Sequence, residues 1–104
     1  MTNQLVERIR EALRVVIDPE LGHNIIDLGF VYDISVVDGA VRITMTATTP
    51  GCPAIRFLKE GVANAAARVP GAGSVDIVMT FDPPWTPSRV EPIARASLGF
   101  AAVN

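Results

Sequence analysis

Residues 4 to 17 carry apolar side chains at the spacing of one helix face, and charged side chains occupy positions between them. The apolar positions are Leu5, Ile9, Leu13 and Val16. Pro19 disfavours helical geometry at the residue before it. The pattern therefore predicts an amphipathic helix that ends at Ile17, followed by a loop with the sequence DPELGHNIIDLG.

A β-hairpin is predicted around Asp38-Gly39, a pair that suits a two-residue type I′ turn between two runs of β-forming residues. Counting back from this turn gives apolar pairs on one face: Val36 with Val41, Ile34 with Ile43, Tyr32 with Met45, and Phe30 with Ala47. The opposite face is mostly polar but includes Val31. We therefore expect one face of the hairpin to pack on a core and the other to meet water.

A second helix is predicted with Pro53 in its first turn and an end before Pro70-Gly71. Its apolar stripe comprises Ile55, Leu58, Val62, Ala65 and Val69. Residues 74 to 81 alternate between apolar and polar, which predicts a third strand with Val78 on the outer face. A last short helix is expected to include Ile93, Ala94 and Leu98. The order α-β-β-α-β-α indicates a two-layer α/β domain, in which helices cover one face of a three-stranded mixed sheet.

This topology is expected to bring three loops to one edge of the sheet. A hairpin places the end of its second strand beside the start of its first strand. The second helix, about 25 Å long at 1.5 Å per residue, can return the chain for a strand parallel to the second. The segments DPELGHNIIDLG, TTPGCP and DPPWTP should then lie close together, with Cys52 in the middle segment.

The composition argues against several classes of protein. The 104 residues, 49% of them hydrophobic, suit a single domain over residues 1–104. Nine basic and eleven acidic residues, without a run of either sign, argue against binding to nucleic acid or to a membrane surface. The N-terminus lacks the apolar block of a signal peptide, and no stretch is apolar enough to span a bilayer. A cytoplasmic protein is expected, in which the single cysteine is a free thiol.

Five residues in these loops are candidates for chemistry: Asp18, Glu20, Thr48, Thr49 and Cys52. Cys52 is expected at or beside a helix N-terminus, which favours thiolate; the alternative is a small buried hydrophobic residue. Asp18 and Glu20 offer metal ligands or a proton-handling pair, unless Asp18 only bonds backbone N–H groups in its own turn. The threonines either donate hydrogen bonds to a ligand or simply finish a strand.

Three ordered motifs resemble those of a known family. VIDPELGHNIIDLGFVYDI, MTATTPGCP and FDPPWTPSRV, with a closing ARASLG, are similar to the small metal–sulfur cluster biosynthesis proteins of the SufT type. The same domain occurs in the targeting subunit of cytosolic iron–sulfur assembly. The resemblance covers residues 5 to 99. It implies an α/β domain that helps mature iron–sulfur proteins, with functional positions at Asp18, Glu20, Thr48 and Thr49 and a reactive cysteine at Cys52.

The leading hypothesis is an accessory factor, not an enzyme, that helps assemble iron–sulfur clusters or deliver them to client apoproteins. A cluster normally takes four protein ligands, and this chain has one thiol. Iron or a cluster is therefore expected to bind only transiently, at Cys52, Asp18 and Glu20 with Thr48 and Thr49 beside them. The remaining ligands would come from a homodimer, from the assembly machinery or from small thiols.

Three alternatives remain open at this stage. The first is a PaaD-like maturation subunit of an aromatic-CoA oxygenase system, although PaaD-type proteins carry a cysteine-rich tail and this sequence has no later cysteine. The second is an enzyme with Cys52 as nucleophile and His23 or a carboxylate as base. The third is a protein-binding adaptor without metal contact.

Overall fold

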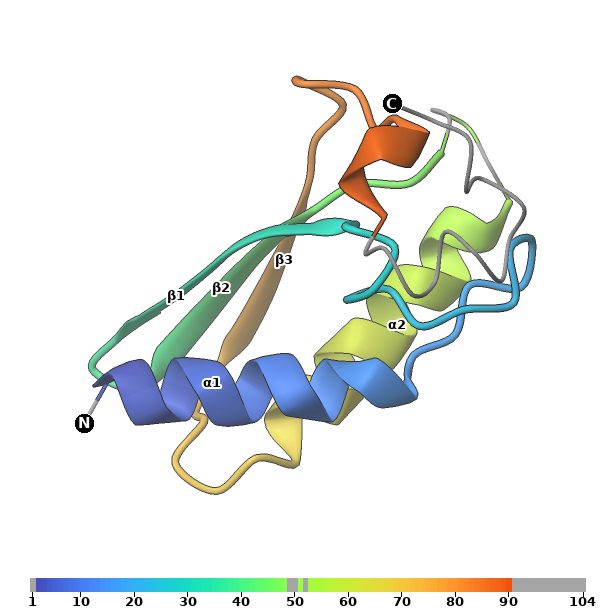
Figure 1. Ribbon diagram of the computed structural model, residues 1–104. Helices are drawn as coiled ribbons and strands as arrows, with labels where there is room; N and C mark the ends of the chain where they lie inside the picture. Colours follow the sequence, from blue (N-terminus) through green and yellow to red (C-terminus); the bar gives the residue numbers. More distant parts are fainter. Residues whose placement is uncertain (1, 49–50, 52, 91–104) are drawn as a thin grey trace.

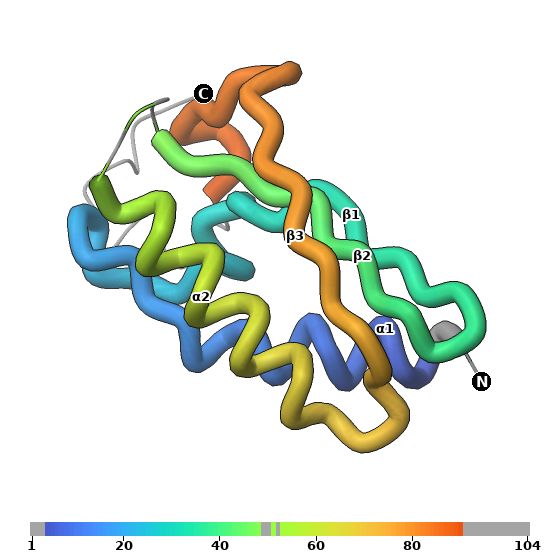
Figure 2. Tube along the Cα trace, turned by 180° about the vertical axis from the view of Figure 1, so that it is seen from behind, coloured from blue at the N-terminus to red at the C-terminus, as the bar shows by residue number. Residues whose placement is uncertain are grey.

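A computed structural model describes residues 2–48, 51 and 53–90. Its helices are α1 (Thr2–Ala12) and α2 (Ala54–Ala67), with short 3-10 helices η1 (Leu13–Val15) and η2 (Pro87–Arg89). The strands β1 (Val31–Val37), β2 (Ala40–Met45) and β3 (Val75–Met79) form one sheet in the order β1-β2-β3. Figures 1 and 2 show α1 and α2 side by side on one face of this sheet. The predicted two-layer α/β fold with a mixed sheet is therefore confirmed.

The first helix is shorter than the sequence predicts. The α-helix ends at Ala12 and continues as η1 to Val15, after which Val16 is extended. Ile17 pairs with Asn24 in an isolated antiparallel bridge, so the predicted helix end at Ile17 is wrong. The chain must leave helical geometry early because the Asp18 N–H donates to the His23 carbonyl, which closes the loop back on itself. The apolar face is as predicted, since Leu5, Ile9, Leu13 and Val16 are all buried.

The hairpin turn is confirmed, because Asp38 and Gly39 both have positive φ values, 51° and 80°. The predicted pairs Val36 with Val41 and Ile34 with Ile43 are also confirmed. A register shift between Val31 and Asp33 then overturns the remaining predicted pairs.

Past this bulge, Met45 pairs with Val31 and not with Tyr32. The Phe30 carbonyl accepts a hydrogen bond from the Thr46 N–H, so the predicted pairing of Phe30 with Ala47 is also wrong. Val31 consequently packs against the core, which corrects its predicted place on the outer face. The extra residue lets the chain bury Phe30 fully while Tyr32 donates its hydroxyl to the Pro83 carbonyl. Of the two valines predicted on the outer face, Val31 and Val78, only Val78 remains there, 37% exposed.

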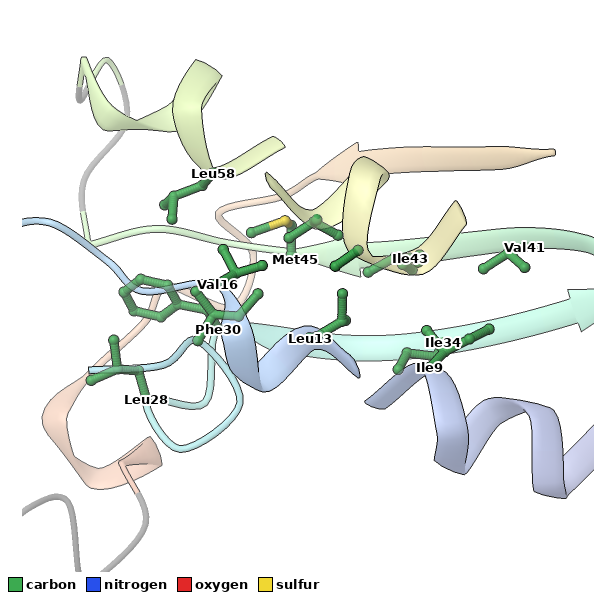
Figure 3. Packing of buried hydrophobic residues seen from close by; sticks show 14 of the residues in the cluster. Ile9, Leu13, Val16, Leu28, Phe30, Ile34, Val41, Ile43, Met45 and Leu58 are labelled. Carbon is green, nitrogen blue, oxygen red and sulfur yellow. The ribbon is translucent and has the colours of Figure 1, made fainter. Parts of the chain in front are cut away.

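The second helix and third strand complete the core. Strand β3 runs parallel to β2, with Ile43 opposite Ile77 and Met45 opposite Met79. Helix α2 buries Leu58 and Val62 fully. Figure 3 shows apolar side chains filling the space between the sheet and the helices. The fully buried residues include Ile9, Leu13, Ile25, Leu28, Phe30, Ile43, Met45, Leu58 and Val62.

One predicted helix and one unpredicted helix lie near the C-terminus. The predicted last helix around Ile93 and Leu98 lies outside the described residues. The 3-10 helix η2, which the sequence analysis does not predict, begins at Pro87 after an extended Thr86. Among the described residues, no helix has the length and apolar character needed to cross a membrane.

Candidate functional site

Three loops meet at the end of the molecule opposite the hairpin turn (Figure 1). The Thr48 hydroxyl, just after β2, donates to Glu20 Oε1 over 3.3 Å. The Trp85 indole N–H, after β3, donates to the Leu28 carbonyl over 2.6 Å. These two contacts tie the loop between α1 and β1 to each of the other two loops. The predicted convergence is therefore confirmed for the described residues.

Asp18 is the centre of a tight turn in the first loop. Only 1% of its surface is exposed, and its Oδ2 accepts the Leu21 N–H over 2.8 Å. Its backbone N–H donates to the His23 carbonyl over 2.9 Å, and its carbonyl accepts the Gly22 N–H over 2.8 Å. The carboxylate is thus used within its own turn, as one of the two sequence interpretations expects.

The pKa of the Asp18 carboxyl is raised above its ordinary value, chiefly because burial disfavours the charged form. The hydrogen bond from Leu21 opposes this rise, and the nearby charge of Glu20 adds to it. Asp18 is therefore a buried acid that holds the loop in shape.

Glu20, two residues later, has the opposite environment. It is exposed, and one of its carboxylate oxygens faces Thr48. The described residues contain no group of three or more His, Cys, Asp or Glu side chains that would suffice to hold a metal ion. Of the two acidic residues in this turn, Glu20 is the accessible one, and Asp18 supports the turn beneath it.

Two of the predicted site residues, Thr49 and Cys52, lie outside the described residues, so their roles stay predictions. Their neighbours define the chain around them. Gly51 has a φ of 78°, which glycine adopts without strain, and Pro53 is the N-cap residue of α2. In sequence, Cys52 immediately precedes this N-cap residue.

Trp85 closes the third loop over the end of the core. Its ring meets Phe30 edge to face, with centroids 5.5 Å apart and planes at 87°. Together with the hydrogen bond to Leu28, this contact holds Trp85 over the end of the core. The Arg89 guanidinium lies 4.7 Å from the ring centre of Tyr32, which adds a second link between the first strand and the third loop.

Gly29 is a structural position that the sequence analysis missed. Its φ is 74°, and a Cβ placed on it would lie 2.3 Å from the Arg89 carbonyl oxygen. Sequence alone shows a glycine before a strand, which fits any turn, and gives no sign of a distant backbone in contact with it. The close approach fixes the third loop against the first.

A second missed group anchors the first loop to the helix before it. Asn24 Oδ1 accepts the Asp27 N–H over 2.9 Å, and Asn24 Nδ2 donates to Asp27 Oδ2 over 3.1 Å. Arg14 then forms an ion pair with the other Asp27 oxygen. The signal for this group was the short spacing of Asn24 and Asp27, which is typical of a side-chain-capped turn.

The sequence of residues 6–95 matches the family described as iron–sulfur cluster assembly protein. The chain is 39% identical over 100 residues to the Fe-S protein maturation auxiliary factor YitW of Bacillus subtilis, covering 95% of this chain and 98% of that protein. It is 36% identical over 86 residues to the Fe-S protein maturation auxiliary factor SufT of Staphylococcus aureus, covering 82% and 98%.

The fold is similar to a crystal structure of a domain of unknown function, DUF59, from Bacillus anthracis. The TM-score is 0.89 with 32% identity, and 94% of each chain is covered. The resemblance carried by the three sequence motifs is thus confirmed, and the chain belongs to the iron–sulfur cluster assembly protein family.

Proposed function

We propose that this protein is an accessory factor that helps deliver iron or an iron–sulfur cluster to client apoproteins, with Cys52 as its thiolate contact. The observation that carries the proposal is the contact between Glu20 and Thr48. It holds an accessible carboxylate against the connection that leads, four residues later, to Cys52. Family membership suggests that the cargo of this site is iron or an iron–sulfur cluster, since the relatives are named as maturation factors for iron–sulfur proteins.

The donor set limits what one chain can hold. A cluster normally takes four protein ligands, and this sequence offers one thiolate. In this proposal the cargo is shared with a partner protein or with small thiols, and is never held by one chain alone. This is the behaviour expected of a transfer factor, because incomplete ligation leaves the cargo free to move to a client with a full ligand set.

The two acidic residues have different roles in this proposal. Glu20 contacts the cargo or its iron directly, since its carboxylate is exposed and oriented toward the second loop. Asp18 positions Glu20 by closing the turn that carries it. For Asp18 to bind iron directly, as the sequence analysis predicts, the turn would have to release its carboxylate from Leu21.

Charge explains why acidic groups accompany a thiolate here. Without cargo, the negative charge of Glu20 would oppose ionisation of a nearby thiol. Bound iron reverses the local field and attracts both anions. In this proposal the thiol is therefore less reactive without iron, and bound iron draws the thiolate and the Glu20 carboxylate together.

Anaerobic reconstitution with iron, sulfide and a small thiol tests this proposal, with visible absorption as the readout. The wild-type protein should develop the absorption of thiolate-bound iron, and Cys52→Ser should lose it. Thr44→Val, on the outer sheet face, serves as the matched control and should behave as the wild type. Equal absorption in wild type and Cys52→Ser, or none in either, would contradict direct cargo contact at Cys52.

A further inference from the structure

We propose that a groove between α1 and α2 docks an acidic amphipathic helix of a partner protein in iron–sulfur cluster assembly. This helix groove is bounded by Arg8, Val15, Phe57 and Arg68 and floored by Gly61 and Ala65. Two adjoining cavities, about 360 and 200 Å³ in volume, make up its length. Val15, Ala65 and Arg68 line both cavities, so the two form one continuous surface.

The walls of the groove are unusually apolar for a solvent-facing surface. Val15 is 74% exposed and Phe57 is 58% exposed, whereas the rest of each helix directs its large apolar residues into the core. Two large exposed side chains on facing elements, with cavities between them, are typical of an interaction site. Burying them against a partner would remove this surface from water.

The floor of the groove depends on a small residue in α2. A Cβ placed on Gly61 would lie 3.3 Å from Cγ1 of Val16, which is tighter than most contacts. The glycine therefore lets α2 approach the end of the first helical segment closely. Because Ala65 is the next floor position along α2, the groove stays shallow and open enough to receive side chains from outside.

The charge of the groove identifies its occupant. Arg8 and Arg68 both line the larger cavity, and none of the residues lining either cavity is acidic. Neither arginine forms an ion pair within the described part of the chain. The whole chain has a formal net charge of −2, so this positive, apolar groove differs from the protein as a whole. Complementary charge calls for carboxylates among apolar residues.

A second copy of this chain fits the groove poorly. In a two-fold symmetric dimer the same patch meets itself, so Arg8 and Arg68 of both copies would face each other without a counter-charge. A helix is the natural shape for the occupant, because its apolar residues recur on one side and match a groove between two helices. From Phe57 to Arg68 the groove runs about 17 Å, or three helical turns.

The position of the groove connects it with the candidate site. Phe57 lies one turn after the start of α2, the helix that follows Cys52 in sequence. A partner helix in the groove would therefore hold its protein next to the end where the three loops meet. That the partner belongs to iron–sulfur assembly rests on the proposed function, whereas the charge and shape of the occupant rest on the groove alone.

Photo-crosslinking in cells tests the docking. A photo-reactive phenylalanine analogue replaces Phe57 in the full chain, and the same analogue at Val37, 68% exposed on the outer sheet face, is the matched control. We expect a crosslink from position 57 to a segment of another protein that is rich in carboxylates and has apolar residues at helical spacing. Arg68→Glu should lower its yield at least about fivefold, because charge reversal replaces attraction by repulsion. Arg68→Lys should lower it much less.

Several outcomes would overturn the proposal. The first is the absence of a crosslink from position 57, and the second is equal crosslinking from position 37. The third is a crosslinked segment that is basic. The fourth is an unchanged crosslink yield in Arg68→Glu, provided that this variant has the melting temperature of the wild type. Crosslinks only within one chain or between two copies would identify a different occupant and also reject it. Cys52→Ser keeps this test separate from the proposed function, because docking should persist in that variant even if cluster delivery is lost.

Discussion

The hydroxyl of Thr48 donates to the carboxylate of Glu20 across 28 positions of sequence, and this contact joins the acidic loop to the connection that leads to Cys52. At 3.3 Å the hydrogen bond is long for two oxygen atoms. Its importance should therefore lie in where it holds Glu20 more than in the stability that it contributes.

Thr48→Val should separate these two effects. The loss of one exposed hydrogen bond is expected to change the free energy of unfolding by less than about 1 kcal/mol. Activity of iron–sulfur enzymes in a deletion strain carrying the variant should nevertheless fall below that with the Thr44→Val control. Urea unfolding measures the first quantity and enzyme assays the second. Equal enzyme activity with both variants would show that the contact has no functional role.

Glu20→Gln should increase the reactivity of Cys52. Removing a nearby negative charge favours thiolate, so alkylation by iodoacetamide at neutral pH should become faster. Glu7→Gln, on the exposed part of α1, makes the same change in net charge elsewhere and should leave the rate as it is in the wild type. If the two variants alkylate at the same rate, Glu20 is not electrostatically close to the thiol.

Asp18→Asn should remove one specific pH dependence of stability. The folded protein holds the Asp18 proton more tightly than the unfolded chain, because burial raises its pKa above the ordinary value of 3.8. Stability from this group is therefore greatest at pH below 3.8 and falls as the pH rises toward the folded pKa. Asn keeps an oxygen that can accept the Leu21 N–H but does not titrate. The wild type should thus lose stability relative to Asp18→Asn across that window.

Urea unfolding of both proteins at several pH values above 3.8 measures this difference. Asp33→Asn, at an exposed position of β1, is the control and should not reproduce the effect. A stability difference between wild type and Asp18→Asn that stays constant with pH would mean that Asp18 titrates alike in the folded and unfolded states.

Gly29→Ala and Gly22→Ala form a matched pair. Both glycines have positive φ values, 74° and 71°, but only Gly29 lies against another backbone segment. Gly22→Ala should cost about 1 to 2 kcal/mol, for the left-handed conformation alone. Gly29→Ala should cost more than about 3 kcal/mol, because the added Cβ meets the Arg89 carbonyl. Equal losses in thermal or urea unfolding would show that the third loop moves away freely.

The sequence predicts the fold well where local chemistry decides it. Asp38-Gly39 requires one turn type, which sets the register of the nearest strand pairs, and the helical and alternating patterns identify the layers. It fails where a distant contact decides. The bulge near Tyr32 accompanies a hydrogen bond from the Tyr32 hydroxyl to the carbonyl of Pro83, which lies 51 residues away. The early end of α1 depends on how Asp18 and His23 close their loop.

For the candidate site, the sequence predicts which loops meet but not the environment of each side chain in them. Topology alone brings the three loops together, and the contacts of Glu20 with Thr48 and of Trp85 with Leu28 confirm this. Sequence could not distinguish Asp18 from Glu20, because both are acidic residues in one turn. The difference arises from burial, which only the folded chain creates. The contact between Gly29 and Arg89 was equally invisible, since no local pattern reports the approach of a remote backbone.

Complementation by Cys52→Ser tests the central claim most directly. The measurement is the activity of an iron–sulfur enzyme under iron limitation in a strain that lacks this gene and carries either wild-type protein or the variant at matched abundance. If the protein delivers cargo through the thiolate, wild type should restore the enzyme activity and Cys52→Ser should not. Full restoration by Cys52→Ser would contradict the account, because a protein that needs no thiolate acts only as an adaptor.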